Sequence, residues 1–201
     1  MANPDIVTLF NSTHKTDIAD LERIVRNNID TQVGFMSPDT LKKSTIEDST
    51  EQAAKKFLLE MPEVDFGDAD FRVEKEEERS LKGTKKFTRI SSITPFKGNE
   101  KVFFLKPAFA QSNNAIRGFV AFKKLTIVMD YEEVNTQGYL EDFEVRFKKT
   151  EEMLASLVPE VETFNALVRS IARESIENRI SEIEYADRAQ RELRDKFKKE
   201  K

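Results

Sequence analysis

Residues 118–132, with the sequence GFVAFKKLTIVMDYE, decide the fold that this chain predicts. Between Leu125 and Tyr131 apolar residues recur with period two, which is typical of a half-buried β-strand. A second strand is expected over 116–122, and Lys123-Lys124 between the two indicates a tight bend or bulge. Adjacent short strands without an intervening helix favour an antiparallel sheet.

The same sheet extends toward the N-terminus. Strands are expected over 85–94 and 101–106, separated by the turn signal Pro-Phe-Lys-Gly-Asn, and a further strand begins near Phe71. Seven of the sixteen Phe lie between residues 79 and 124. Because Phe has no polar atom to satisfy, most of these rings are expected in the core of a small, Phe-rich sheet.

Three helices are expected before the sheet. The first runs over 17–28, where apolar residues lie on one helical face. The second runs over 38–43, with Ser37 as N-cap and proline at the first helical position. The third is expected over 49–61, because its first residues fit a Ser-x-x-Gln capping box.

A heptad-like seam predicts long helices after Gly138. Pro159 interrupts the seam, so the helices form either a hairpin or one kinked helix. The seam either packs on its own domain or pairs with a partner, and the second option makes it an oligomerisation surface. The residues of this surface are Leu140, Phe143, Phe147, Leu154, Leu157, Phe164, Val168 and Ile171.

Together these patterns predict an α+β protein. Its N-terminal helices are followed by a small antiparallel sheet with a Phe-rich core and by a long C-terminal helical hairpin or coiled coil. The expected regions are a helical region at 1–62, a β region at 63–135 and a long-helix region at 136–201. Their total size suits one compact domain with a helical extension.

A basic block inside the acidic chain points to an anionic partner. Residues 79–124 hold eleven Lys or Arg and a single acid, Glu100, whereas the whole chain has a net charge of −4. Such a block either binds phosphates or is neutralised by acids of its own fold. The residues of the predicted basic face are Lys82, Lys85, Lys86, Arg89, Lys97, Lys101, Lys123 and Lys124.

Catalytic chemistry has few candidate residues. The chain has no Cys, and its single His, His14, stands in a polar stretch that suits an exposed surface position. Asp65, Asp68 and Asp70 precede a strand as in a PD-(D/E)XK nuclease, but Val73 stands where the second acid is required. We therefore expect no enzyme activity, no metal site and no cofactor.

Nothing in the sequence predicts a membrane protein. The N-terminus lacks a basic segment followed by an apolar run, and no stretch approaches the 18 or so apolar residues of a membrane-spanning helix. The expected location is the cytoplasm.

The order of motifs resembles a group of uncharacterised bacterial proteins. The element Pro95-Phe96-Lys97-Gly98-Asn99 with a following Val-Phe-Phe looks like their P-F-x-G-(D/N)-x-x-L-F motif, and a Gly-led strand pair and two long helices come after it. In that group the module precedes a PD-(D/E)XK-like nuclease domain of the restriction and phage-defence type. Here the sequence ends at Lys201 without that domain, so the chain is expected to be a fragment of a longer effector or a stand-alone relative.

These observations predict a non-catalytic binding, sensing and oligomerisation module of a bacterial defence system. Its basic sheet face is expected to bind nucleic acid or another phosphorylated ligand. The alternative is a protein–protein scaffold that acts through its C-terminal helices and has no role with nucleic acid.

Overall fold

The computed structural model describes residues 5–10, 18–80, 83–107, 115–132 and 136–199. The chain is an α+β protein with antiparallel strands and a long C-terminal helix, as predicted. It divides into two compact units, each assembled from two separate segments. Unit 1 comprises Met1–Asp17 and Leu59–Val161, and unit 2 comprises Ile18–Leu58 and Glu162–Lys201.

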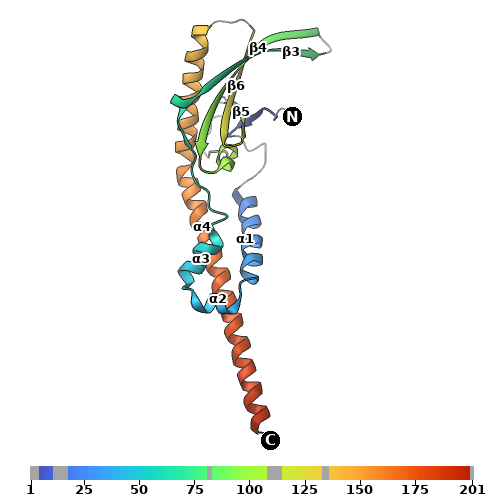
Figure 1. The fold of residues 1–201 in the computed structure, drawn as a ribbon, viewed down its shortest axis with the longest axis vertical. Helices are drawn as coiled ribbons and strands as arrows, with labels where there is room; N and C mark the ends of the chain where they lie inside the picture. The colour runs from blue at the N-terminus through green and yellow to red at the C-terminus, as the bar shows by residue number, and fades with distance from the viewer. Residues whose placement is uncertain (1–4, 11–17, 81–82, 108–114, 133–135, 200–201) are drawn as a thin grey trace. The chain divides into compact units, whose positions relative to one another are not determined.

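Unit 1 contains an antiparallel sheet of six strands in the order β1-β5-β6-β4-β2, with β3 also paired to β4. The strands are β1 (Val7–Leu9), β2 (Glu63–Val64), β3 (Asp70–Ser80), β4 (Gly83–Lys97), β5 (Ile116–Ala121) and β6 (Lys124–Tyr131). β6 pairs with β4 only from Thr88 onward, whereas β3 follows β4 back to Gly83. The first residues of β4 and the last of β3 therefore form a two-stranded arm beyond the sheet (Figure 1).

The β5–β6 hairpin confirms the predicted strand pair and places its bend one residue earlier. Ala121 pairs with Lys124, so the loop has only two residues, Phe122 and Lys123. Their φ angles are 52° and 58°. Two left-handed residues match the right-handed twist of the strands in a type I′ turn, which usually takes Asn-Gly.

The predicted strand over 101–106 is wrong. Residues Glu100–Phe104 form a 3-10 helix, η3. The Asn99 side chain starts it by accepting a hydrogen bond from the Lys101 amide at 3.0 Å. Val102 and Phe103 are neighbours in sequence and both are fully buried, which an alternating strand with one face on the core does not allow.

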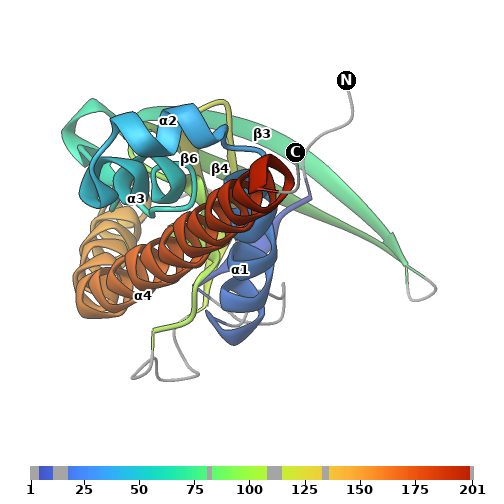
Figure 2. The same cartoon turned by 90° about the horizontal axis from the view of Figure 1, so that it is seen from below.

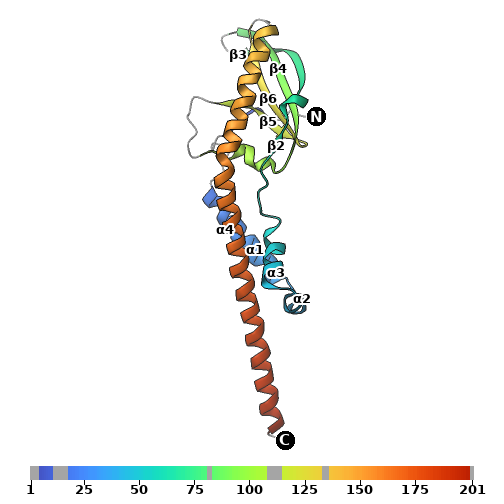
Figure 3. The same cartoon turned by 90° about the vertical axis from the view of Figure 1, so that its left-hand side faces the viewer.

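The first part of helix α4 (Thr136–Lys199) covers one face of this sheet, as Figure 3 shows. The Phe71 ring of β3 lies edge-on to Phe143 with centroids 5.3 Å apart, and Phe66 stacks on Phe147 at 4.3 Å. Burial of each ring that is fully enclosed, such as Phe143 and Phe103, contributes about 1.5–3 kcal/mol. The core of unit 1 contains several Phe rings, as predicted. Of the six described Phe between residues 79 and 124, however, only Phe96 and Phe103 are buried, so the expectation that most of these rings lie in the core is wrong.

Unit 2 consists of three short helices and the second part of α4 (Figure 2). The short helices are α1 (Ile18–Gly34), α2 (Pro38–Lys43) and α3 (Ile46–Ala54). In α1 the buried face continues to Val33, so this helix ends later than predicted. In α2 the Ser37 Oγ atom accepts the Thr40 amide hydrogen, which confirms the predicted cap.

The predicted start and end of α3 are wrong. Its N-cap is Thr45, whose Oγ1 atom accepts from the Asp48 amide at 3.1 Å. Ser49 lies inside the helix and is buried, so it cannot serve as a cap. The helix ends at Ala54, well before Pro62, because a turn follows in which the Phe57 amide donates to the Ala54 carbonyl.

Exposed ion pairs join the helices of unit 2. Arg26 of α1 contacts Glu174 of α4 at 2.9 Å, and Arg169 contacts Glu51 of α3 at 2.6 Å. All four side chains are largely exposed, so solvent screens both pairs and they add little to stability. The main stabilisation comes from buried apolar side chains of α4 such as Val168 and Ile176.

Of the two arrangements predicted at Pro159, the single helix forms and the hairpin does not, because α4 continues through this residue. A proline inside a helix removes one amide donor and crowds the carbonyl four residues earlier. The buried stripe resumes directly after it with Val161 and Phe164. Packing on both sides therefore holds the residues around Pro159 in the helical conformation.

Among the described residues, no helix is long and apolar enough to cross a membrane.

Candidate nucleic-acid interface

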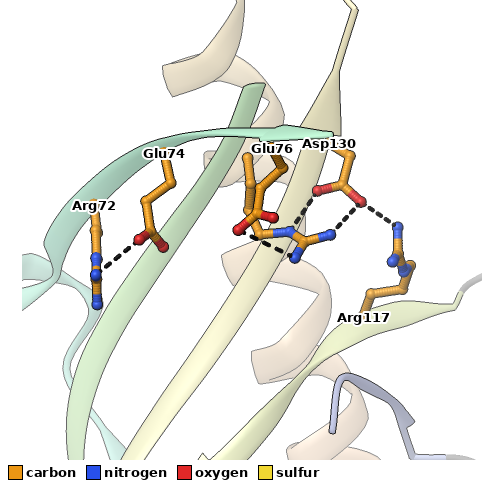
Figure 4. A network of polar contacts seen from close by, with 6 residues as sticks. Arg72, Glu74, Glu76, Arg117 and Asp130 are labelled. Atoms are coloured by element: carbon orange, nitrogen blue, oxygen red, sulfur yellow. Dashed lines mark hydrogen bonds and ion pairs between the residues drawn. The ribbon is translucent and has the colours of Figure 1, made fainter. Parts of the chain in front are cut away.

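The two faces of the sheet differ in chemistry. Phe71 points toward α4, and the alternation of a strand places Arg72 and Glu74 on the opposite face. Arg89 is paired in register with Glu74 on one side and with Asp130 on the other, so these residues share that face. We call it the charged face, and Figure 4 shows its central residues. They are Arg72, Glu74, Glu76, Arg89, Arg117 and Asp130.

Asp130 is the centre of the ion pairs on the charged face. Its carboxylate accepts from Arg89 Nε at 2.8 Å, from Arg89 Nη2 at 3.2 Å and from Arg117 Nη1 at 3.0 Å. Burial acts to raise the pKa of Asp130, but the hydrogen bonds and charges of the two arginines outweigh burial, so the pKa lies below its ordinary value. The hydrogen bond to Asp130 raises the pKa of Arg89 in turn.

Three residues of the predicted basic face pair with acids of the same sheet. Lys85 contacts Glu132 at 2.7 Å, Lys86 contacts Glu77 at 3.1 Å, and Arg89 belongs to the Asp130 cluster. These three pairs agree with the expectation that acids of the fold neutralise part of the block. Lys82 lies outside the described residues.

The other four residues of the predicted basic face lie at the opposite end of β4. Lys124 of β6 is paired in register with Pro95 of β4. Lys97 lies two residues after Pro95 and therefore on the same face of β4. The Lys123 Nζ atom donates to the Gly98 carbonyl at 2.6 Å, and Lys101 is the second residue of η3, just beyond Gly98. We call this group the lysine turn, and it consists of Lys97, Lys101, Phe122, Lys123 and Lys124.

Acids lie near the lysine turn as well, since Glu63, Asp65 and Asp68 line an open pocket together with Lys97. Within the described ranges, no ion pair joins Lys97, Lys101 or Lys124 to an acid. Glu63 is the register partner of Lys97 on β2, and it is exposed. The three ammonium groups are therefore accessible to an external anion.

The aromatic ring of Phe122 is 95% exposed, the largest exposure of any large apolar side chain that the structure describes. Its backbone is left-handed, which costs a non-glycine residue roughly 1–2 kcal/mol. Sequence reasoning placed Phe122 at the end of a strand and missed its exposure. The available signal was an apolar residue at a turn position that normally takes Asn or Gly.

Backbone contacts fix the position of the lysine turn. The Phe96 amide donates to the Lys123 carbonyl at 3.1 Å, and the Asn99 amide donates to the Glu60 carbonyl at 2.9 Å. Gly98 has φ of 89°, and a Cβ atom there would lie 2.4 Å from the Met61 carbonyl oxygen. Only glycine allows the chain to approach this closely, so the loop after β4 has little freedom.

The predicted oligomerisation surface is mostly part of the chain's own core. Its buried members are Phe143, Leu154, Leu157, Phe164, Val168 and Ile171, each less than 9% exposed. Phe147 is half-buried against Phe66, and Leu140 is exposed. A second copy cannot reach the six buried side chains while the chain keeps this structure. Their spacing reflects intramolecular packing, which uses the same helical stripe as a coiled coil.

Metal-binding geometry does not occur in the part of the chain that the structure describes. No three His, Cys, Asp or Glu side chains there lie close enough to hold an ion.

The chain matches no protein-family model, and neither curated proteins nor solved structures match it significantly. The resemblance to nuclease-associated bacterial modules therefore stays a prediction, and the functional argument depends on geometry.

Proposed function

We propose that this chain is a non-catalytic module that binds single-stranded nucleic acid at the lysine turn. The observation that carries the proposal is the Phe122 ring, which projects into solvent beside lysine side chains. Proteins that bind single strands combine aromatic rings for base stacking with cations that follow the phosphates. The lysine turn supplies both within one pinned hairpin.

The strained backbone adds to this argument. Left-handed residues other than glycine cluster at functional sites, because the strain persists only where the surrounding structure holds it. Here Phe122 and Lys123 are both left-handed, although Asn-Gly would form the same turn without strain. Phe122 is exposed and its left-handed backbone lowers stability. Contact of the ring with a ligand would explain why Phe stands at this position.

Substitution of Phe122 by Asn tests the proposal. Asn tolerates the left-handed backbone, so Phe122→Asn removes the ring and keeps the turn. Stacking on one base is worth about 1–3 kcal/mol, so affinity for a fluorescent oligonucleotide of about 16 nucleotides should fall by roughly 5- to 150-fold. Fluorescence anisotropy at fixed salt measures this loss.

Phe35 provides the matched control. Its ring is 87% exposed at the end of α1, where the neighbouring residues are Gly34 and Met36 rather than lysines. Phe35→Asn should leave the affinity unchanged. Equal affinities of the Phe122→Asn variant and the unmodified chain would refute the proposal. Parallel titrations with single-stranded DNA, single-stranded RNA, duplex DNA and anionic vesicles identify the polymer, and binding to vesicles alone would also refute it.

We further propose that the module acts in the cytoplasm of a bacterium as part of antiviral defence. The support is the resemblance of the Pro95–Asn99 element and the following strand pair to modules that precede nuclease domains. A host that carries the gene should plate phage less efficiently than a host that carries the Phe122→Asn variant. Equal plating of both hosts contradicts this role.

A protein–protein scaffold is the second candidate. The last turns of α4 expose Tyr185, Leu193 and Phe197, each by more than half of its surface. Leu193 and Phe197 are four residues apart and therefore lie on one helical face, which suits helix pairing. In this case Leu193→Ser with Phe197→Ser should convert an oligomer to a monomer in light scattering after size exclusion. A monomeric unmodified chain at all concentrations removes this candidate.

A further inference from the structure

A cavity in unit 1 lies apart from the lysine turn. Its volume is about 520 Å³, it is open to solvent on one side, and it is bounded by the start of β5, the second half of β6 and the first part of α4. Arg117 and Tyr131 line it from the sheet, while Arg146, Lys149 and Val145 line it from the helix. Asp130 of this cavity and Lys124 of the lysine turn are six residues apart along β6, a separation of roughly 20 Å in a strand.

Arg146 and Lys149 lie one helical turn apart, and each lines the cavity. The Arg146 Nη1 atom donates to the Ala115 carbonyl at 3.2 Å. No ion pair among the described residues connects either cation to an acid. Burial lowers the pKa of Lys149, and the charge of Arg146 lowers it further, with a partial offset from Glu152. Among the residues that the structure describes, the cavity therefore holds two neighbouring cations that form no ion pair with an acid.

The acids of the cavity are already engaged. Asp130 accepts from Arg89 and Arg117, as described above. Asp142 accepts from the hydroxyl of Tyr131 at 3.0 Å, and burial together with this bond raises the pKa of the tyrosine. Tyr131 is thus neutral across the physiological range and adds no negative charge. On the side of the sheet that faces α4, the cations Arg146 and Lys149 stand against one carboxylate, Asp142, so this part of the cavity has a positive excess.

We infer that this cavity binds a small molecule that carries a phosphate group. The guanidinium of Arg146 offers a planar set of N–H donors that suits phosphate oxygens, and Lys149 adds a point charge beside it. The ring of Tyr131 and the side chain of Val145 provide an apolar wall for the organic part of the ligand. A bound phosphate supplies the missing counterion of Arg146 and Lys149.

Isothermal titration calorimetry with inorganic phosphate and with AMP tests the inference. The unmodified chain should bind both, with AMP the tighter ligand because its organic part reaches the apolar wall. Arg146→Gln combined with Lys149→Gln should weaken AMP binding about tenfold or more, since charge-assisted hydrogen bonds are lost. Lys148→Gln is the matched control, because Lys148 is exposed on the same helix and does not line the cavity.

The variants separate this site from the proposed nucleic-acid interface. The double variant should change its melting temperature little, because it removes two like charges, no ion pair and only the exposed hydrogen bond of Arg146 to the Ala115 carbonyl. Phe122→Asn should leave AMP binding unchanged, so failure at one site does not imply failure at the other. Absence of AMP and phosphate binding by the unmodified chain overturns the inference. Binding that survives the double variant, or that Lys148→Gln weakens as much, also overturns it.

Discussion

Replacement of Asp130 by Asn should destabilise unit 1 more than any other change of a single charge on the charged face. Asp130 accepts three hydrogen bonds from Arg89 and Arg117, and the side chains of Asp130 and Arg89 are both only 22% exposed. Asn retains one acceptor oxygen and loses the charge, so the half-buried Arg89 loses its hydrogen-bonded charged partner and keeps only the longer contact to Glu76 at 3.9 Å. A hydrogen bond to a charged group contributes about 1.5–3 kcal/mol.

Partial exposure reduces the expected cost. Solvent screens part of the interaction, and we therefore expect a loss of about 2 kcal/mol in the free energy of unfolding. For a chain of this size, such a loss lowers Tm by roughly 4–8 °C. Glu132→Gln is the control, because Glu132 and its partner Lys85 are both largely exposed and the change should leave the free energy of unfolding nearly unchanged. Urea titrations followed by circular dichroism measure both values.

The pH dependence of the same difference gives a second check. The pKa of Asp130 lies below its ordinary value of 3.8, so its contribution to stability is complete above that pH. The contribution is lost as pH falls through the lowered pKa, because the carboxyl is then protonated in the folded state as well. The stability difference between the unmodified chain and Asp130→Asn should therefore shrink below pH 3.8. A difference that stays constant in acid, or a variant as stable as Glu132→Gln, would refute this reasoning.

Three further changes test the local geometry, and equilibrium urea unfolding measures each of them. Gly98→Ala should cost about 2 kcal/mol or more, since its Cβ would lie 2.4 Å from the Met61 carbonyl oxygen and φ is 89°; a neutral result would show that the loop can shift. Thr45→Ala should cost about 1 kcal/mol through loss of the cap on the Asp48 amide, whereas Thr45→Ser should cost much less. Phe122→Asn should increase stability by about 1 kcal/mol, because left-handed backbone is less costly for Asn; a loss of stability would mean that the ring supports the fold.

Local patterns explain why much of the fold was predictable. The strands β4, β5 and β6 have strong β-formers with period two, and Ser37-Pro38 is a specific helix start. The strand predicted over 101–106 was wrong because Val102 and Phe103 are residue types that favour strands. The side chain of Asn99 instead caps a 3-10 helix at this place. The start of α3 could not be predicted from residue type, because both Thr45 and Ser49 are residues that favour the N-cap position.

The candidate site depends on register, which local patterns do not contain. Arg89 and Asp130 are 41 positions apart in the sequence. They meet because the register of β4 and β6 places them directly opposite each other. Composition identified the basic block but could not tell which lysines the acids of β3 and β6 would neutralise. The exposure of Phe122 likewise follows from the two-residue turn between β5 and β6.

The helical seam shows a similar limit. Phe143 and Val168 recur at heptad-like spacing, and both are buried within the chain. A stripe that packs on its own sheet or helices has the same period as one that packs on a second copy. Only the three-dimensional structure shows which elements cover the stripe, and the sequence period does not contain this information.

The salt dependence of oligonucleotide binding tests the central claim most directly. Each lysine that contacts a phosphate of a single strand adds about −0.7 to the slope of log K against log salt concentration. The triple variant Lys97→Gln, Lys101→Gln and Lys124→Gln should therefore reduce the magnitude of the slope by about 2. Lys85→Gln with Lys86→Gln, which removes cations already paired with Glu132 and Glu77, should leave it nearly unchanged. An unchanged slope in the triple variant, or an equal reduction in the paired-lysine control, contradicts phosphate binding at the lysine turn.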